Sequence, residues 1–413
     1  MIKIKNEFEE PKSLLLNMLP TNLDVYNLLK LKRGPHPTRN KAKTRRLVAD
    51  ESAETLRAIT CDGAAANIGT GTGCITVLET VLNRNLQRIV CILHTVENVL
   101  RKVVNDFDGR VLGPFNFGGP IGRQLNDVTK DYPVAEFIRI ESQLYPLPEA
   151  SIKKLGHKQQ YLYKISQLIN GGPDGNPELV DYIKKNSIGI IYLARWTITA
   201  SRILRLYVSR TVPEVSLLAL VKFVMEVYVP SWFETKHKTS VVEAAKVFFN
   251  MMRRIDTFGI GPIKEIAKQS LMMNSFAAHP ENIILSLMAE EDPELRQIAT
   301  AFLQNASPGH RPYQKPNLIF EANHYSEMIN FNETPFCYPP LCDIQFHGQR
   351  FILYPDFPSN TQGIERLIAD IKNAAEGIRK FEKLDHSTAS VVESRRSFPA
   401  GMNFFDYVNR FGH

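Results

Sequence analysis

The sequence predicts an α/β protein with mostly α content, in which a small parallel sheet is interrupted by a large all-α insertion. Residues 56–61 and 88–93 are two short apolar stretches separated by an amphipathic helical pattern, which is typical of two parallel strands joined by a crossover helix. From residue 152 to about 304, helical patterns dominate and are separated by Pro, Gly and Asn. A final helix is expected over about 361–384, where the apolar residues form one stripe.

Composition limits the class of protein. The chain has 413 residues, 44% hydrophobic and 23% charged, which predicts a globular protein of two or three domains. The formal net charge of +7 is modest for this length. No run of eighteen apolar residues occurs and the N-terminus is too charged for a signal peptide, so we expect no membrane span and no secretion. The odd, small number of cysteines favours a reducing compartment over a disulfide framework: Cys61, Cys74, Cys91, Cys337 and Cys342.

Residues 1–54 are expected to form a basic, partly disordered arm. Residues 14–19 and 23–31 could each form a short helix. Eight basic residues then follow within seventeen positions that contain no acid. Such a run is typical of an arm that neutralises nucleic-acid phosphates or acts as a nuclear import signal, although a basic linker without a partner has the same pattern. The eight residues are Lys30, Lys32, Arg33, Arg39, Lys41, Lys43, Arg45 and Arg46.

Two acids are candidate ligands for a divalent metal. Asp62 follows the first predicted strand, and ligands of open α/β sheets bind at the carboxyl ends of strands. Glu365 lies in the first turn of the predicted final helix. Two carboxylates on neighbouring elements suit a Mg²⁺ phosphoryl-transfer site, for which a third acid is not found. Each acid also has an ordinary explanation, because Asp-Gly often ends a strand and the helix dipole favours Glu at an N-terminus.

Cys91 and His94 place a thiol and an imidazole three residues apart at the end of the second predicted strand. A structural zinc site needs four ligands, and Cys337 and Cys342 are the candidates for the remaining two. The alternative is a core cysteine beside a hydrogen-bonded histidine. The turn at 69–73, with Gly at alternate positions, fits a nucleotide-binding loop poorly, because the spacing is not G-x-G-x-x-G.

A third group of candidates lies on one predicted helix. Arg195 and Trp196 begin it, and Arg202 and Arg205 follow at a spacing that could give a basic face for DNA phosphates. The alternative is a core tryptophan with solvated arginines.

Taken in order, these motifs resemble those of the hAT superfamily of DNA transposases and its domesticated relatives. The matching stretches are Cys61-Asp-Gly-x-x-x-Asn67, Val90-Cys-Ile-Leu-His94, Gln159-Gln-Tyr-Leu162, Arg195-Trp196, Ala278-His-Pro-Glu-Asn282 and Thr361-Gln-Gly-Ile-Glu-Arg366. The resemblance spans about residues 55–400. It implies an RNase H-like core interrupted by a helical insertion, with Asp62 as the second catalytic aspartate and Glu365 as the catalytic glutamate.

The resemblance also sets the expected domain boundaries. These are a basic arm at 1–54, the first part of an RNase H-like core at 55–104, the helical insertion with a loop-rich return at 105–355, the final core helix at 356–390 and a tail at 391–413. The family's first aspartate lies well upstream of the second, within a three-stranded meander, and no such strands are recognised here. The core is therefore expected to be truncated.

The functional expectation follows from the missing first aspartate of the family's site. The chain is interpreted as a transposase-derived, nucleic-acid-associated protein that is catalytically inactive. The expected location is the nucleus, with the cytoplasm as the alternative. The expected partners are DNA and a second copy of the chain, and Mg²⁺ is expected only if the site is functional. Two alternatives stay open: an active Mg²⁺-dependent transposase or nuclease that takes its third carboxylate from Glu51 or Glu54, and a non-functional transposon fragment.

Overall fold

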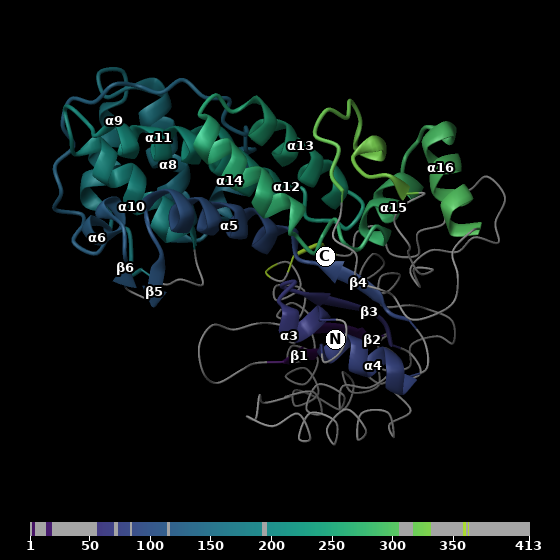
Figure 1. The fold of residues 1–413 in the computed structure, drawn as a ribbon. Coiled ribbons are helices and arrows are strands. Elements are labelled where there is room, and N and C mark those ends of the chain that lie inside the picture. Colours follow the sequence, from purple (N-terminus) through teal and green to yellow (C-terminus); the bar gives the residue numbers. More distant parts are fainter. Residues whose placement is uncertain are drawn as a thin grey trace, which may run out of the picture.

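The computed structural model describes residues 2–4, 14–18, 56–69, 73–82, 85–113, 116–191, 196–304, 317–331, 358–360 and 362. A small mixed sheet lies beside a much larger helical body, and helix α5 (Ile92–Val103) leads from one to the other (Figure 1). The expected α/β class with mostly α content is confirmed at this level. The RNase H-like core and the domain boundaries stay predictions.

The sheet has the order β1-β2-β3-β4, formed by Ile2–Ile4, Leu14–Met18, Leu56–Cys61 and Gln87–Val90. The parallel pair is the predicted one: β3 and β4 run in register from Ala58 opposite Gln87 to Cys61 opposite Val90. The crossover contains the short helix α3 (Ala65–Ile68) and α4 (Cys74–Leu82).

Two sequence expectations are wrong in this region. Residues 14–18 form a strand instead of a short helix, because Leu14–Met18 pairs antiparallel with β1 on one side and β3 on the other. The result is a three-stranded meander in chain order, which the sequence analysis did not recognise. The second parallel strand also ends at Val90, and the apolar Ile92 and Leu93 belong to α5.

Helix α5 connects the sheet to the helical body. It packs against α12 and α14 and continues as the π-helical segment η2 (Val104–Asp108). A small hairpin follows, with β5 (Val111–Gly113) and β6 (Asn116–Phe117). The carboxylate of Asp108 then accepts the backbone N–H groups of Ile121 and Gly122 at 2.9 and 2.7 Å, which satisfies the N-terminus of α6.

The rest of the helical body consists of helices whose apolar faces form one continuous buried core with α5. The elements are α6 (Pro120–Leu125), α7 (Glu149–Lys153), α8 (His157–Gly171), α9 (Pro177–Lys185), α10 (Trp196–Val208), α11 (Val215–Phe223), η3 (Val224–Tyr228), α12 (Val229–His237), α13 (Ala244–Thr257), α14 (Gly261–Met272), α15 (Glu281–Met288), α16 (Pro293–Gln304) and η4 (Tyr325–Glu327). Helix α15 contacts β4 and so joins the helical body to the sheet.

Helices α11 and α12 form one continuous helix through the π-helical segment η3. Pro230 is the second residue after η3 and cannot donate a hydrogen bond to the preceding turn, so the wider π turn accommodates it. This helix, Val215–His237, is long and apolar enough to cross a membrane, with a mean hydropathy of 1.5, but 72% of its apolar window is buried inside the protein. That burial is typical of a core helix, so the helix is weak evidence for a membrane span.

Candidate functional site

Asp62 lies where the sequence analysis expected it, at the carboxyl end of β3. Its side chain is half-buried, and Oδ1 accepts hydrogen bonds from the backbone N–H of Ala64 at 3.0 Å and from Nδ2 of Asn67 at 2.7 Å. These contacts hold the turn that leads into α3. Gly63 makes the turn with a φ of 75°, in the left-handed region that favours glycine. Asp62 therefore has a structural role in addition to any chemical one.

A loop more than two hundred residues away lies against this turn. Ser275, just after α14, donates its hydroxyl to the carbonyl of Gly63 at 3.4 Å. A Cβ placed on Gly63 would lie 2.2 Å from the Ser275 hydroxyl oxygen, so the two segments are in close contact. The neighbouring Asn274 accepts a hydrogen bond from the Thr95 hydroxyl of α5 at 3.1 Å. The 274–275 loop thus belongs to the same edge of the sheet as Asp62.

The chain also returns to this edge from its C-terminal part. Ile92 at the start of α5 donates its N–H to the carbonyl of Ser359 at 3.2 Å, and the adjacent Cys91 N–H donates to the carbonyl of Cys61 at 2.8 Å. Ser359 is held in turn by Thr239, whose carbonyl accepts its N–H at 2.7 Å and its hydroxyl at 3.0 Å. The return segment 358–360 is therefore hydrogen-bonded to the start of α5. The start of α5 is in turn hydrogen-bonded to Cys61, the residue before Asp62.

Glu365 lies three residues beyond Gln362, the last residue of this segment that the structure describes. Gln362 accepts a hydrogen bond from Lys236 of α12 at 2.8 Å. Because Glu365 is outside the described residues, its predicted pairing with Asp62 stays a prediction. The described part of the segment leads to the edge of the sheet that the pairing requires.

Cys91 and His94 form the expected local pair at the start of α5. The thiol of Cys91, fully buried at the N-cap position, lies 3.1 Å from Nδ1 of His94. Burial alone would lower the pKa of His94, but the negative charge and hydrogen bond of Cys91 and the carboxylates of Glu97 and Asp62 together raise that pKa to about 10. Burial, reinforced by the charge of Asp62, raises the pKa of the Cys61 thiol to about 12.

The residues described here do not complete a metal site. No group of three His, Cys, Asp or Glu side chains within the described ranges could hold a metal ion. For Mg²⁺, the predicted ligand that the described residues include is Asp62, and its Oδ1 already accepts two hydrogen bonds. For zinc, Cys337 and Cys342 lie outside the described residues, so only the Cys91–His94 pair is in place. The donor set within the described residues fits neither metal.

The basic face predicted on α10 is wrong. Arg202 and Arg205 are buried, with exposed fractions of 9% and 0%. Arg202 donates to the carbonyls of Leu125, Asn126 and Gly189, and Arg205 donates to those of Lys130 and Tyr132. The guanidinium groups therefore hold two loops against α10 and do not reach DNA phosphates.

The remaining candidates divide between the core and the part of the chain that is not described. Trp196 is 3% exposed and begins α10 as a core residue, in agreement with the alternative interpretation. Arg195 lies outside the described residues, as do Lys41, Lys43, Arg45 and Arg46. Their predicted roles in nucleic-acid binding stay predictions.

A buried ion pair that the sequence did not reveal stabilises the crossover between β3 and β4. Arg88 of β4 and Glu79 of α4 are buried; Nε of Arg88 donates to Oε1 of Glu79 at 3.3 Å, and Nη2 makes a second, closer contact with Oε2. Glu79 also accepts the N–H of Leu86 at 3.0 Å. An amphipathic pattern indicates which residues are polar but not which of them are buried together, so the pair carried no signal in the sequence.

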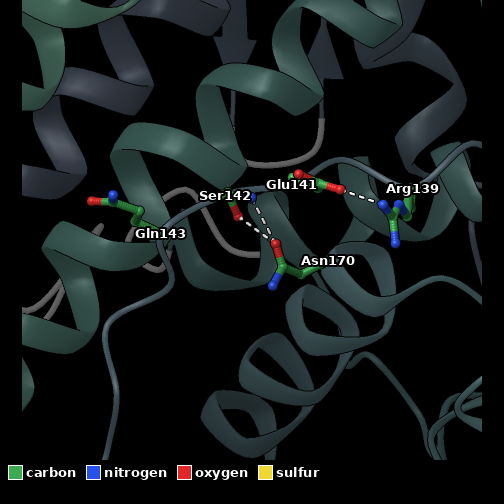
Figure 2. A pocket seen from close by; sticks show the side chains of 5 residues that line it. All are labelled: Arg139, Glu141, Ser142, Gln143 and Asn170. Atoms are coloured by element: carbon green, nitrogen blue, oxygen red, sulfur yellow. Dashed lines mark hydrogen bonds and ion pairs between the residues drawn. The ribbon is translucent and has the colours of Figure 1, made fainter.

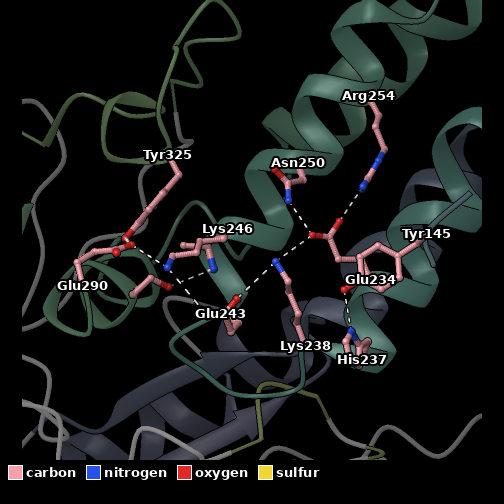
Figure 3. A network of polar contacts seen from close by, with 12 residues as sticks. Tyr145, Glu234, His237, Lys238, Glu243, Lys246, Asn250, Arg254, Glu290 and Tyr325 are labelled. Carbon is pink, nitrogen blue, oxygen red and sulfur yellow. Dashed lines mark hydrogen bonds and ion pairs between the residues drawn. The ribbon is translucent and has the colours of Figure 1, made fainter. Parts of the chain in front are cut away.

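A larger polar network joins the loop that holds Ser359 to the helical body (Figure 3). Glu234 of α12 is 2% exposed and contacts Arg254 at 2.8 Å, Asn250 at 2.7 Å and Lys238 at 3.5 Å. Lys238 also reaches Glu243 at 3.6 Å, which in turn lies 4.0 Å from Lys246. Burial of Glu234 is thus balanced by two cations, which fixes the turn between α12 and α13.

A polar cavity of about 470 Å³ lies apart from this edge, where the extended segment 139–143 meets the C-terminal end of α8 (Figure 2). Asn170 accepts hydrogen bonds there from the backbone N–H of Ser142 at 2.6 Å and from its hydroxyl at 3.3 Å. Arg139 and Glu141 form an exposed ion pair at its rim. Four of the five lining residues are thus paired with one another, Ser142 with Asn170 and Arg139 with Glu141.

No protein-family model, curated protein or solved structure matches this chain. The resemblance to hAT transposases therefore rests on the motifs quoted in the sequence analysis.

Proposed function

We propose that this chain is a nucleic-acid-associated protein derived from an hAT-type transposase and that it does not cleave DNA strands. Two observations support this proposal. One is the order of the motifs in the sequence, and the other is the hydrogen bond between the N–H of Ile92 and the carbonyl of Ser359. That bond brings the segment preceding Glu365 back to the carboxyl end of the β3–β4 pair, next to Asp62. An acid-bearing edge assembled from segments about 270 residues apart is the arrangement that the family resemblance requires.

The donor set within the described residues supports the proposed lack of activity. Phosphoryl transfer with two metal ions needs carboxylates that hold both ions. The described strands β1 and β2, which lie before Asp62 in the meander, contain no Asp or Glu. Within the described residues Asp62 is left without a second carboxylate at the required place, and it serves as a capping group for the turn into α3.

Nucleic-acid binding is assigned to the arm at 30–46, because the described arginines of α10 are committed to the protein interior. Each Lys or Arg that neutralises a phosphate releases a counterion and makes binding depend on salt. The same run of basic residues is the proposed nuclear import signal.

Duplex-DNA binding measured by fluorescence anisotropy over a range of NaCl concentrations tests the binding function. Replacement of Lys41, Lys43, Arg45 and Arg46 by Ala should weaken binding and lower the slope of log K against log salt by roughly 3 to 4. The matched control replaces four exposed lysines of the helical body, Lys153, Lys154, Lys184 and Lys185, and should leave the slope unchanged. Equal losses in both variants, or no binding by the unmodified chain, would contradict the assignment.

A nicking assay on supercoiled DNA with Mg²⁺ or Mn²⁺ tests the lack of activity. The unmodified chain and an Asp62→Asn variant should both give only background cleavage. Cleavage by the unmodified chain that disappears in Asp62→Asn would favour the alternative of an active nuclease. A chain that aggregates on purification would favour the non-functional fragment, because unpaired sheet edges associate.

A further inference from the structure

One end of the helical body carries lysines that have no acidic partner. Helices α8 and α9 pack against each other there, and Nε2 of His157, which begins α8, lies 3.0 Å from Oδ1 of Asn186, which follows α9. Lys158 follows His157 directly, Lys154 precedes it by three residues, and Lys184 precedes Asn186 by two. None of these three lysines forms an ion pair within the described residues. Their positive charges are therefore not compensated by that part of the chain.

An exposed isoleucine lies beside these lysines. Ile190 is 64% exposed. A Cβ placed on the preceding residue, Gly189, would lie 2.7 Å from Cε and 3.2 Å from Nζ of Lys158, so the lysine side chain lies against the backbone next to Ile190. This surface is called the basic end, and it consists of Lys154, Lys158, Lys184 and Ile190.

The start of α16 carries the opposite charge. Glu291, Asp292 and Glu294 are exposed, and Asp292 and Glu294 form no ion pair within the described ranges. Arg296 donates to the backbone carbonyl of Glu291 at 2.8 Å, so the backbone uses that guanidinium. Ile298 is 36% exposed and lies one turn after Glu294 on the same face of the helix. This surface is called the acidic end, and it consists of Glu291, Asp292, Glu294 and Ile298.

The basic and acidic ends are complementary but lie apart in one molecule. Helix α9 packs on α8 and helix α16 packs on α15, at opposite ends of the helical body (Figure 1). The helix dipole favours lysine at the C-terminus of α9 and acids at the N-terminus of α16, but this local effect gives no reason for an exposed isoleucine beside each. Opposite charges around an apolar contact are the usual composition of a specific protein–protein interface.

We propose that the basic end of one copy of this chain binds the acidic end of a second copy, with Ile190 packed against Ile298 and the lysines paired with the carboxylates. The contact is heterologous, because it joins two different surfaces. Each pair of copies leaves one basic and one acidic end free, so association continues into larger oligomers. DNA phosphates would pair with the lysines but would offer no apolar partner to Ile190 and no role for the acidic end. The inference is independent of the proposed nucleic-acid function, which is assigned to the arm at 30–46.

Analytical ultracentrifugation of the full chain without DNA tests the association. The weight-average mass should lie near the 46.9 kDa of one chain at low concentration and should roughly double or more by about 100 µM, since interfaces of modest quality associate in the micromolar range. In about 1 M NaCl the Debye length falls to about 3 Å, and the mass should return to that of one chain. A chain that stays monomeric at every concentration in low salt would overturn the proposal.

Two charge-reversal variants test which surfaces meet. One variant carries Lys154→Glu with Lys184→Glu, and the other carries Glu291→Lys with Glu294→Lys; all four side chains are exposed. Each variant alone should be monomeric, because its two ends then have the same sign of charge. An equimolar mixture should associate again, which misfolded variants would not do. Association of either variant alone, or none in the mixture, would overturn the proposal.

Two further variants separate this contact from other uses of charge. Arg101→Glu with Arg110→Glu makes the same change of net charge at exposed arginines away from both ends, and should associate as the unmodified chain does. The variant with the four arm residues at 41, 43, 45 and 46 replaced by Ala should also associate normally. Loss of association in the arm variant would assign the arm as the partner of the acidic end, and loss in the arginine variant would make the effect one of net charge. Either loss would overturn the proposal.

Discussion

The sheet and the helical body each contain a buried arginine, and they treat its charge in different ways. In the sheet, Arg88 is paired with the carboxylate of Glu79, and both side chains are less than 7% exposed. In the helical body, Arg205 is more deeply buried and donates only to carbonyl groups of the described residues. One charge is neutralised by a carboxylate of the chain, whereas the partners of the other within the described residues are carbonyl dipoles.

The difference shows that burial of an arginine has two separate consequences. Its N–H groups must be satisfied, which carbonyls do well, and its charge must be compensated, which carbonyls do only in part. A loop that wraps around a helix can meet the first need with its backbone alone. The second need requires a carboxylate or an anion.

The largest expected effect comes from breaking the neutralised pair. Glu79→Gln leaves the buried Arg88 without a counter-charge and should lower the free energy of unfolding by roughly 3 kcal/mol. Urea unfolding followed by circular dichroism measures the change. The exposed pair of Glu149 and Lys153 provides the control, since Glu149→Gln should cost less than about 0.5 kcal/mol. Similar costs for both variants would show that the Arg88–Glu79 pair is not buried.

A smaller effect is expected at the second arginine. Arg205→Met removes an uncompensated charge, which is favourable, and leaves the carbonyls of Lys130 and Tyr132 unpaired, which is unfavourable. The two effects oppose each other, so we expect a loss of about 2 kcal/mol or less in the same urea experiment. A loss greater than that of Glu79→Gln would contradict the distinction drawn between the two regions.

The turn after β3 offers a test of how the sheet and the helical body meet. Gly63→Ala introduces a Cβ at a φ of 75° and 2.2 Å from the hydroxyl oxygen of Ser275, and should cost about 1 to 2 kcal/mol. The double variant Gly63→Ala with Ser275→Gly keeps the backbone strain but removes the collision. It should recover part of the loss in thermal unfolding. No recovery would show that the 274–275 loop does not contact this turn in solution.

The most specific expected effect is the titration of His94. Its folded pKa of about 10 lies above the ordinary value of 6.5, so protonated His94 stabilises the fold fully below about pH 6.5. That contribution is lost as the pH rises through about 10. NMR of the His94 imidazole should show no titration between pH 6 and 8. In the Cys91→Ser variant the contacts of the Cys91 sulfur with His94 are lost, and the pKa of His94 should fall. A pKa near 6.5 in the unmodified chain would contradict the pairing.

Part of this fold could be predicted from the sequence. The parallel pair β3–β4 was recognised because both strands are short apolar runs on either side of an amphipathic helix. The boundary of β4 was misplaced by three residues, since Ile92 and Leu93 are apolar in either conformation and only the backbone hydrogen bonds of α5 assign them to a helix. Strand β2 was missed because Leu14–Met18 is too short for its apolar pattern to separate strand from helix.

The candidate site was predictable only in its local parts. The Cys91–His94 contact follows from i, i+3 spacing at a helix start, and Asp62 follows from its place at a strand end. The contacts of Ser275 and Ser359 with this edge join residues separated by about 200 residues or more, and no local pattern encodes them. The arginines of α10 were misassigned for a related reason: their partners lie in loops, most of them about 70 residues upstream, which a helical wheel does not contain.

The π turn at η3 has a consequence for how the α11–α12 helix tolerates change. A π turn behaves as one residue inserted into a regular helix, and one residue corresponds to a rotation of about 100°. The π turn absorbs that extra residue, so Glu234 and Trp232 of α12 keep the orientation in which they contact Arg254 and Glu97. Deleting one residue from Val224–Tyr228 would preserve this orientation, but it would restore a regular turn in which the ring of Pro230 meets a carbonyl of the preceding turn. Deleting one residue between Pro230 and Trp232 would instead turn both side chains away from their partners by that angle.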